Sequence, residues 1–145
     1  MMLVSQILQV KGDESVFTVP PSTTVAKAAE ILAGKRIGAL IISSDGKKAL
    51  GILSERDIVR ELGTRGTACL KETVDKLMTA RLVTCTRQSR TSEVLEKMSA
   101  GRFRHMPVVE GGVMVGLISI GDVVKARLSE LTHEVDALEG MIRGA

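Results

Sequence analysis

The sequence predicts an α/β (α+β) chain built from two similar units, each with the order strand, helix, strand, strand, helix. One observation is a nine-residue stretch, GILSERDIV from Gly51, that returns as GLISIGDVV from Gly116, 65 positions later. The other is that short apolar runs alternate with segments of helical spacing in both halves. With 145 residues, 44% of them apolar, the chain can bury a core between two small units.

The repeated stretch reads as a buried strand that runs directly into a helix. Ser54 and Ser119 have the chemistry of helix N-caps, and Asp57 and Asp122 follow three residues later in the first turn. A capping box explains such a motif when it occurs once. The hydroxyl, the carboxylate and the backbone amides would also suit a ligand with a phosphate and neighbouring hydroxyls, as in a nucleotide. Both interpretations stay open at this point.

The first half shows the predicted order of elements. The expected elements are a helical turn at 4–8, a loop at 11–15, a strand at 16–19, a helix at 24–33, strands at 37–42 and 49–53, and a helix at 54–62. Gly34 is expected to end the first long helix, and Asp45-Gly46 is typical of a hairpin turn. Residues 63–67 break the helical pattern and are expected to form the linker.

The second half repeats this order. The expected elements are a short helix at 74–78, a strand at 82–85, a helix at 91–100 ended by Gly101, strands at 105–109 and 113–118 joined by a Gly111-Gly112 turn, and a helix from Ser119. The predicted boundaries are 1–66 for the first unit and 67–145 for the second. Because roughly 60 residues bury little surface alone, the units are expected to pack together with pseudo-twofold symmetry.

The last helix is longer than its counterpart and carries an apolar seam. The seam residues are spaced three and four apart: Leu128, Leu131, Val135, Leu138 and Ile142. The seam either packs back on the first unit or pairs with another subunit. It is too short for an independent coiled coil, and we favour a contact within a homodimer.

Composition and charge argue against several classes of protein. The net charge of +3 is spread along the chain without a basic run, and two Phe with no Trp or Tyr cannot form a stacking platform, so no nucleic-acid partner is expected. No apolar run reaches 18 residues and no signal-peptide pattern is present, which predicts no membrane association and a cytoplasmic location. Cys69 and Cys85 lack metal-ligand spacing and are expected to be reduced and structural.

A catalytic constellation is missing from the sequence. There is no Walker-type phosphate loop and no His/Cys/Asp cluster for a metal, and the chain has only two histidines. Asp57 and Asp122 could imitate a catalytic carboxylate pair, but carboxylates at helix starts are stabilised in the ionised form and no water-activating partner is evident. We therefore expect no enzymatic activity, no catalytic residues and no metal site.

Taken together, the chain resembles a tandem pair of cystathionine β-synthase (CBS) domains, an arrangement called a Bateman module. The likeness covers nearly the whole chain and rests on the two Gly-to-Asp motifs, on Thr24-Val25 and on the run RFRHMPVV from Arg102. It implies an adenosine-containing ligand in the cleft between the units, with AMP the first expectation and ADP, ATP, NAD or S-adenosylmethionine as alternatives. Binding would change the conformation and signal to an unknown effector protein. The alternative is a structural dimerisation module with vestigial clefts.

The resemblance also implies roles for individual residues. Ser54 and Ser119 would contact phosphate, and Asp57 and Asp122 would hold ribose hydroxyls. The further expected ligand contacts are Thr18, Gly38, Ala39, Leu40, Arg56, Thr84, Arg102, Arg104, His105, Met106 and Pro107.

The two expected sites differ in sequence. Arg102 and Arg104 are expected on one face of a strand, where both guanidinium groups could meet a phosphate. The first unit has Gly38-Ala39 where the second has Arg104-His105, and Ile41 where the second has Pro107. We therefore predict unequal occupancy of the two sites.

Overall fold

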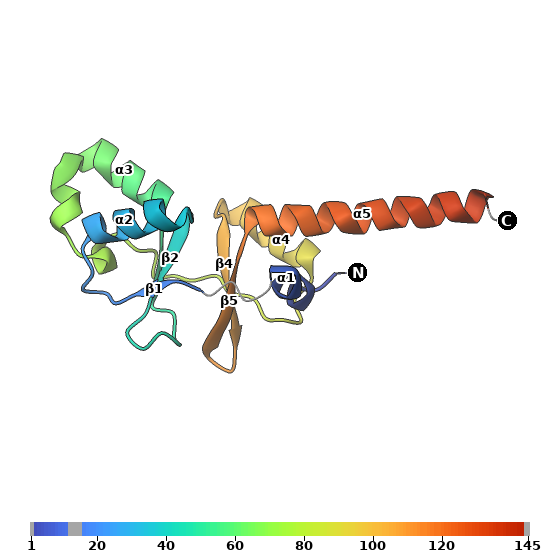
Figure 1. Ribbon diagram of the computed structural model, residues 1–145, viewed down its shortest axis with the longest axis horizontal. Coiled ribbons are helices and arrows are strands. Elements are labelled where there is room, and N and C mark those ends of the chain that lie inside the picture. Colours follow the sequence, from blue (N-terminus) through green and yellow to red (C-terminus); the bar gives the residue numbers. More distant parts are fainter. Residues whose placement is uncertain (1, 12–15, 144–145) are drawn as a thin grey trace. The chain divides into compact units, whose positions relative to one another are not determined.

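The computed structural model describes residues 2–11 and 16–143, which form helices and two sheets in an α+β fold, as predicted (Figure 1). The elements in chain order are α1 (Val4–Lys11), β1 (Thr18–Val19), α2 (Val25–Lys35), β2 (Ala39–Ile42), β3 (Gly51–Ser54), α3 (Glu55–Arg65), the 3-10 helices η1 (Gly66–Lys71) and η2 (Val74–Lys76), α4 (Thr91–Gly101), β4 (His105–Glu110), β5 (Val113–Ser119) and α5 (Ile120–Arg143). The predicted loop at 11–15 lies outside the described residues except for Lys11, which ends α1.

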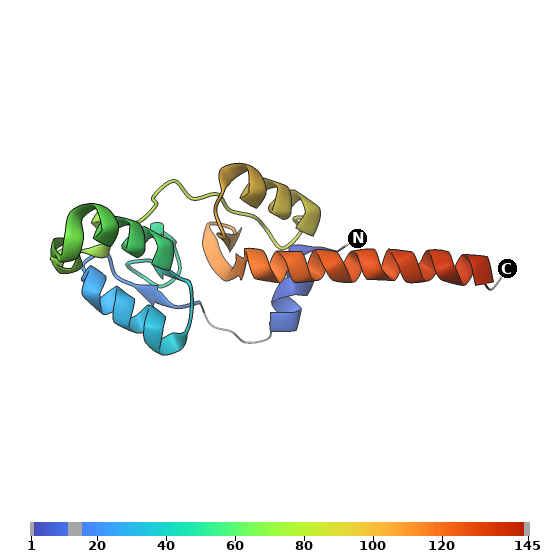
Figure 2. The same ribbon diagram turned by 90° about the horizontal axis from the view of Figure 1, so that it is seen from above.

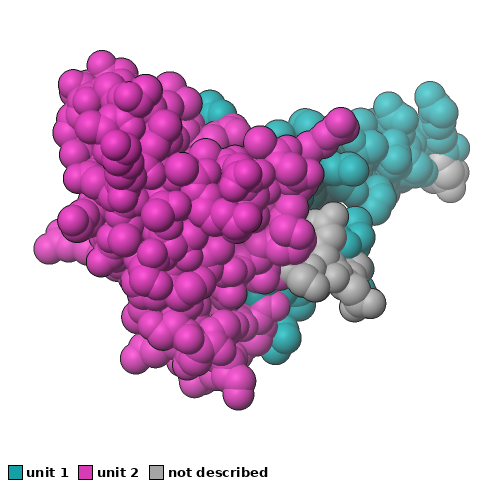
Figure 3. All heavy atoms as spheres, turned by 60° about the vertical axis from the view of Figure 1, so that its left-hand side comes forward, with its two compact units in different colours: residues 1–14, 84–109, 116–145 teal, residues 15–83, 110–115 magenta. Residues whose placement is uncertain are grey.

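Two compact units make up the chain, and each contains segments from both sequence repeats (Figure 3). Unit 1 consists of residues 1–14, 84–109 and 116–145, and unit 2 consists of residues 15–83 and 110–115. The boundary expected at 66/67 divides the repeats of the sequence. The compact units are grouped differently, because α1 belongs with the second repeat and residues 67–83 belong with the first.

Unit 2 contains a three-stranded sheet in the order β1-β2-β3. β1 runs parallel to β2 and β3 runs antiparallel to it, with Ala39 opposite Ser54. All four residues of β2 are buried, as its continuous apolar run predicts. Helices α2 and α3 pack against each other, and apolar residues from both join the strands in one core. Gly46 has a φ of 76°, which confirms the predicted turn between β2 and β3.

The glycine that opens each copy of the motif lies where another segment approaches closely. A Cβ on Gly51 would stand 2.4 Å from the sulfur of Met78 and 3.1 Å from the carbonyl oxygen of Thr79. A Cβ on Gly116 would stand 2.7 Å from Leu8 of α1. Each glycine therefore leaves room for a segment from elsewhere in the chain, which is residues 78–79 at Gly51 and α1 at Gly116.

Two helix ends differ from the prediction. Gly34 does not end α2, which continues to Lys35, and α4 includes Gly101. The residues that follow, Arg36 and Arg102, adopt the left-handed conformation with φ of 54° and 55°. This conformation costs about 1–2 kcal/mol for a residue with a Cβ. The two repeats therefore share a helix end that glycine would form with less strain.

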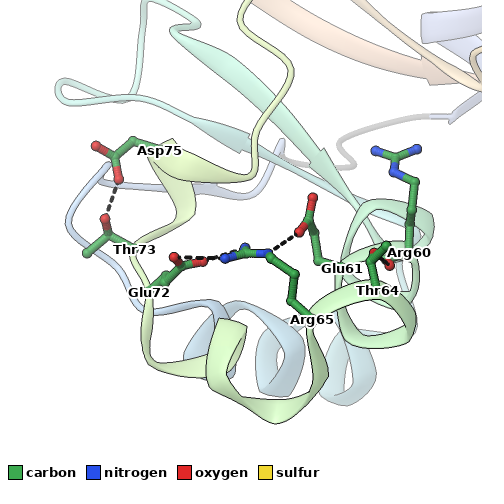
Figure 4. Close-up of polar contacts among 7 residues, drawn as sticks. All are labelled: Arg60, Glu61, Thr64, Arg65, Glu72, Thr73 and Asp75. Atoms are coloured by element: carbon green, nitrogen blue, oxygen red, sulfur yellow. Dashed lines mark hydrogen bonds and ion pairs between the residues drawn. The ribbon is translucent and has the colours of Figure 1, made fainter.

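The predicted linker at 63–67 is wrong, because α3 continues to Arg65 and leads directly into η1. The Arg65 guanidinium lies 2.6 Å from a carboxylate oxygen of Glu61 and 2.6 Å from one of Glu72, as Figure 4 shows. These bonds raise the pKa of Arg65 and lower that of Glu72. Cys69 is fully buried in the same segment. Ion pairing and burial thus order residues that look like a loop in the sequence.

The strand predicted at 82–85 is reduced to one bridge between Cys85 and Val108. In the first repeat, the Ile41 amide donates to the Phe17 carbonyl oxygen at 3.1 Å. Pro107 stands where the first repeat has Ile41, and proline has no N–H to donate. Among the described residues, the second repeat therefore keeps the bonds at Cys85, whose amide donates to the Pro107 oxygen at 3.1 Å and whose oxygen accepts from the Val109 amide at 2.8 Å.

Unit 1 is built from α1, α4, α5 and the parts of β4 and β5 at 105–109 and 116–119, whereas the turn of the β4-β5 hairpin belongs to unit 2. Gly111 and Gly112 in that turn have positive φ, as the prediction requires. The α1 backbone is tied down by the amide of Val4, which donates to the Ser89 oxygen at 2.9 Å. The first half of α5 packs against α4 through Val123 and Ala126. The second half of α5 extends past α1 and α4, as Figures 1 and 2 both show.

Candidate functional sites at two helix starts

The start of α3 carries the first candidate site, and its capping box is confirmed. The Asp57 amide donates to the Ser54 hydroxyl oxygen at 3.2 Å, and the Ser54 amide and hydroxyl both donate to Asp57 Oδ2 at 2.9 Å. Arg60 lies one turn along the helix and donates to Asp57 Oδ1 at 2.8 Å. Both oxygens of this buried carboxylate are therefore hydrogen-bonded.

The second site, at the start of α5, repeats the capping bonds with a different cation. The Ser119 amide donates to Asp122 Oδ2 at 2.9 Å, and the Asp122 amide donates to Ser119 Oγ at 3.2 Å. Lys11 Nζ, from the end of α1, donates to Asp122 Oδ2 at 2.9 Å and to the Leu117 carbonyl oxygen at 3.0 Å. The carboxylate is thus paired within α3 at the first site, and with another helix at the second.

Asp122 is held in its ionised form. Burial acts to raise the pKa of this carboxyl, but the hydrogen bonds from the Ser119 amide and from Lys11, together with the charge of Lys11, lower it further than burial raises it. The net pKa lies below the ordinary value of 3.8. The site therefore presents an anionic oxygen acceptor at neutral pH, which suits neutral hydroxyl donors.

A loop is tied to each helix start by an equivalent hydrogen bond. The Glu55 amide donates to the Gly38 carbonyl oxygen at 2.9 Å, and the Ile120 amide donates to the Arg104 carbonyl oxygen at 2.7 Å. These bonds bring two predicted segments, 38–40 and 104–107, to the helix starts at which Ser54 and Ser119 lie. They also engage the first amide of each helix, so an anion at either helix start would compete for bonded as well as unbonded amides.

The other predicted contacts differ in what they can offer a ligand. Ala39, Leu40, Met106 and Pro107 are buried, so their side chains serve the core and their backbones would have to make any contact. Thr18 is half-buried in β1 opposite Ile41, whereas Thr84 is exposed and belongs to no strand. Arg56, Arg102 and Arg104 are exposed, and His105 is half-buried.

The prediction that Arg102 and Arg104 share a strand face is wrong. Arg102 is the left-handed residue after α4, and Arg104 lies in a bend before β4, which begins at His105. The apolar strand pattern of residues 105–109 does not extend back to these arginines, because the helix end must reverse the chain first. Their side chains therefore leave the backbone from unlike conformations, and the alternation of a strand does not align them.

Sequence reasoning missed Lys11 and Arg60, the two cations that pair with the motif carboxylates. Arg60 follows Asp57 by three residues on a helix, and that spacing alone predicts the contact. Lys11 lies 111 residues from Asp122, and no local pattern signals the contact.

A pocket of about 460 Å³ lies between α2 and α3 in unit 2. Its lining residues are Ala29, Leu32, Ala33, Arg36, Ile37, Gly38, Glu55, Ile58 and Val59. It shares Gly38 with the predicted contacts but contains neither Ser54 nor Asp57. This pocket therefore does not coincide with the first site.

Other kinds of site have little support within residues 2–11 and 16–143. These residues contain no group of three His, Cys, Asp or Glu side chains that could hold a metal. No helix among them is long and apolar enough to cross a membrane. Cys69 and Cys85 are both free thiols and buried, and burial raises the pKa of Cys85 to about 11, against a smaller opposite effect of Lys97.

Comparison with known proteins finds the same repeat. The model of the CBS domain matches residues 6–64 and again residues 74–129. Over 97% of this chain, the sequence is 30% identical to the Arabidopsis thaliana CBS domain-containing protein CBSX3, mitochondrial, and the match covers 72% of that protein. Three longer Arabidopsis relatives are also 29–32% identical, but the chain covers only 22–24% of their length.

Solved structures agree with the sequence comparison. The CBS-domain containing protein ATU1752 from Agrobacterium tumefaciens is 42% identical with a TM-score of 0.82, covering 87% of this chain and 99% of that one. The CBS domain protein PAE2072 from Pyrobaculum aerophilum, solved in complex with AMP, is 27% identical with a TM-score of 0.77, covering 91% of this chain and 99% of that one.

Proposed function

The chain belongs to the CBS domain family, and we propose that it is a regulatory module that binds an adenosine-containing ligand at the two helix starts and signals by conformational change. AMP is the first candidate, and ADP, ATP, NAD and S-adenosylmethionine are the alternatives. We propose a cytoplasmic location, no catalysis by the chain itself and an effector protein that responds to the bound state.

One observation carries this proposal: both repeats present the same set of groups at a helix start. Each helix start has a Ser hydroxyl, an Asp carboxylate and first-turn amides. A backbone hydrogen bond ties each helix start to the loop that precedes β2 or β4. Phosphate suits the amides and the hydroxyl, while ribose hydroxyls suit the carboxylate. The AMP complex of the Pyrobaculum protein shows that a relative with this fold takes such a ligand.

The roles we propose follow this chemistry. Ser54 and Ser119 contact phosphate, and Asp57 and Asp122 accept bonds from ribose hydroxyls. Backbone or side-chain contacts come from Thr18, Gly38, Ala39, Leu40, Arg56, Thr84, Arg102, Arg104, His105, Met106 and Pro107. The two sites differ in occupancy because Asp57 is paired with Arg60, whereas Asp122 is paired with Lys11.

A panel of thermal shift measurements tests the binding proposal. A ligand at about 100 times its dissociation constant stabilises the native state by about 2.7 kcal/mol, which corresponds to a rise in Tm of roughly 5–10 °C. We expect this rise with at least one of the five candidate ligands, and we expect Asp122→Ala to remove or reduce it. Mass spectrometry of small molecules released from the denatured protein would identify a ligand retained in purification.

The rival function is a structural dimerisation module, and the exposed apolar residues of α5 favour dimerisation as such. We propose a homodimer in either case. If none of the five ligands raises the Tm while light scattering shows a dimer, the rival replaces the regulatory proposal.

A further inference from the structure

Helix α5 carries an apolar stripe that its own unit leaves exposed. The stripe consists of Val124, Leu128, Leu131, Val135, Leu138 and Ile142, with exposed fractions between 41% and 81%. Spacings of four and three alternate along it, as in the seam of a coiled coil. We call these six residues the α5 stripe.

The rest of unit 1 uses a different face of the helix. Val123 and Ala126 are buried, and Glu130 accepts a hydrogen bond from the Thr91 hydroxyl of α4. At 100° per residue, this face is centred about 125° from the stripe. Packing in unit 1 therefore leaves the stripe available for a partner.

We propose that the α5 stripe pairs antiparallel with the α5 stripe of a second copy of this chain. The spacing is symmetric about position 133, so reversing the partner helix aligns all six residues. Val124 then packs near the partner subunit's Ile142, Leu128 near the partner subunit's Leu138, and Leu131 near the partner subunit's Val135. This inference gives a direction and a register to the homodimer proposed above.

Charges beside the stripe distinguish the two directions. Lys125 and Glu139 lie on the same flank, 14 residues apart, and both are exposed. In the antiparallel pair, each Lys125 lies close to the partner subunit's Glu139, which gives two attractive contacts. One like-charge contact remains, between the two copies of Glu134 at the centre.

A parallel pair has the less favourable set of charges. On each of its two flanks, Glu134 would lie near the partner subunit's Glu139, and the two like charges would repel. No pair of opposite charges on either flank would offset this repulsion. Antiparallel helices also align their dipoles favourably. The charges therefore favour the antiparallel direction.

Cysteine cross-linking tests the direction. In the antiparallel pair, the double variant Leu128→Cys/Leu138→Cys should form an intersubunit disulfide under mild oxidation, and each single variant should not. The native thiols of Cys69 and Cys85 are buried and should not form disulfides under these conditions. His133→Cys is the matched control, because position 133 lies opposite the stripe and should not cross-link in either direction.

A charge swap gives a second readout. Lys125→Glu should weaken the dimer roughly three- to tenfold, as expected for two exposed ion pairs turned repulsive. Lys125→Glu/Glu139→Lys should restore the affinity.

Three results would overturn the inference: disulfides in the single variants, which indicate a parallel pair; no recovery in the charge swap; or a monomer in light scattering. Each leaves the thermal shift with nucleotide unaffected, so failure here is distinct from failure of the binding proposal.

Discussion

The serine and aspartate of each motif take part in helix capping, and that role is compatible with ligand binding. Each carboxylate accepts the backbone bond of the N-cap residue through Oδ2, and each Ser oxygen accepts an amide. These residues could be predicted from the sequence because capping depends on three-residue spacing. The cation from α1 that pairs with Asp122 could not, because long-range contacts leave no local pattern.

Removing either cap should destabilise the protein. Ser54→Ala and Ser119→Ala should each lower the free energy of unfolding by about 1 kcal/mol, within the usual range of about 0.5–2 kcal/mol for a lost cap. Urea denaturation measures this change. Ser99→Ala, at an exposed position inside α4, is the control and should change stability by less than about 0.5 kcal/mol. Equal effects at all three positions would contradict the capping role.

The lowered pKa of Asp122 predicts a dependence of stability on pH. A carboxyl whose pKa is lower in the folded state contributes stability above its unfolded pKa, near 3.8, and loses it as pH falls through the folded value. Asp122→Asn should therefore be less stable than the wild type at pH 7, and the difference should shrink below about pH 4. Urea denaturation at pH 7 and pH 3 measures this. A difference that stays constant would rule out ionisation as its source.

Because Arg102 has a left-handed conformation, replacing it with glycine should affect the stability of the protein and the binding of nucleotide in opposite directions. Arg102→Gly relieves a strain of about 1–2 kcal/mol, so the variant should be as stable as the wild type or more stable. If Arg102 contacts phosphate, the same variant should bind nucleotide more weakly. Arg36→Gly is the matched control, with the same backbone conformation in the other repeat. Weaker binding in Arg102→Gly alone would support the proposed contact, and unchanged binding would remove Arg102 from the site.

At the scale of elements, the sequence predicted the long helices and the hairpins, because helical spacing, caps and glycine turns are local signals. It missed the extension of α3 across Gly63, where Arg65 forms ion pairs with Glu61 one turn earlier and with Glu72 after η1. It also predicted a strand at 82–85 that the structure lacks, because the partner position in β4 is Pro107. Both errors arise where contacts outside the local hydrophobic pattern affect the backbone, through the ion pairs of Arg65 in one case and through Pro107 in the other.

Replacing Gly63 tests whether this residue lies inside a helix or in a flexible linker. Gly63 lies inside α3, and a Cβ there would meet no atom within 4 Å. Gly63→Ala should therefore raise the free energy of unfolding by about 0.5–1 kcal/mol, the cost of glycine inside a helix. Gly51→Ala is the contrasting variant and should destabilise by about 1–3 kcal/mol, because the added Cβ overlaps Met78. A neutral Gly63→Ala would instead favour the flexible linker.

At the scale of the whole molecule, duplication gives two sites with the same groups but different pairings. Asp57 is paired with a cation from its own helix, whereas Asp122 is paired with the last residue of α1. A ligand that replaces the Lys11 contact would therefore act on two helices, α1 and α5, whereas a ligand that replaces the Arg60 contact would act on α3 alone. We therefore expect binding at the second site to have the larger conformational effect.

Calorimetric titration with AMP tests the central claim most directly. We predict saturable heat that is not fitted by two identical sites, that is reduced by Asp57→Asn at one site, and that is lost in Asp57→Asn/Asp122→Asn. Absence of binding heat with AMP at several temperatures, and with ADP, ATP, NAD and S-adenosylmethionine in turn, would contradict the proposal that this protein is a nucleotide-binding module.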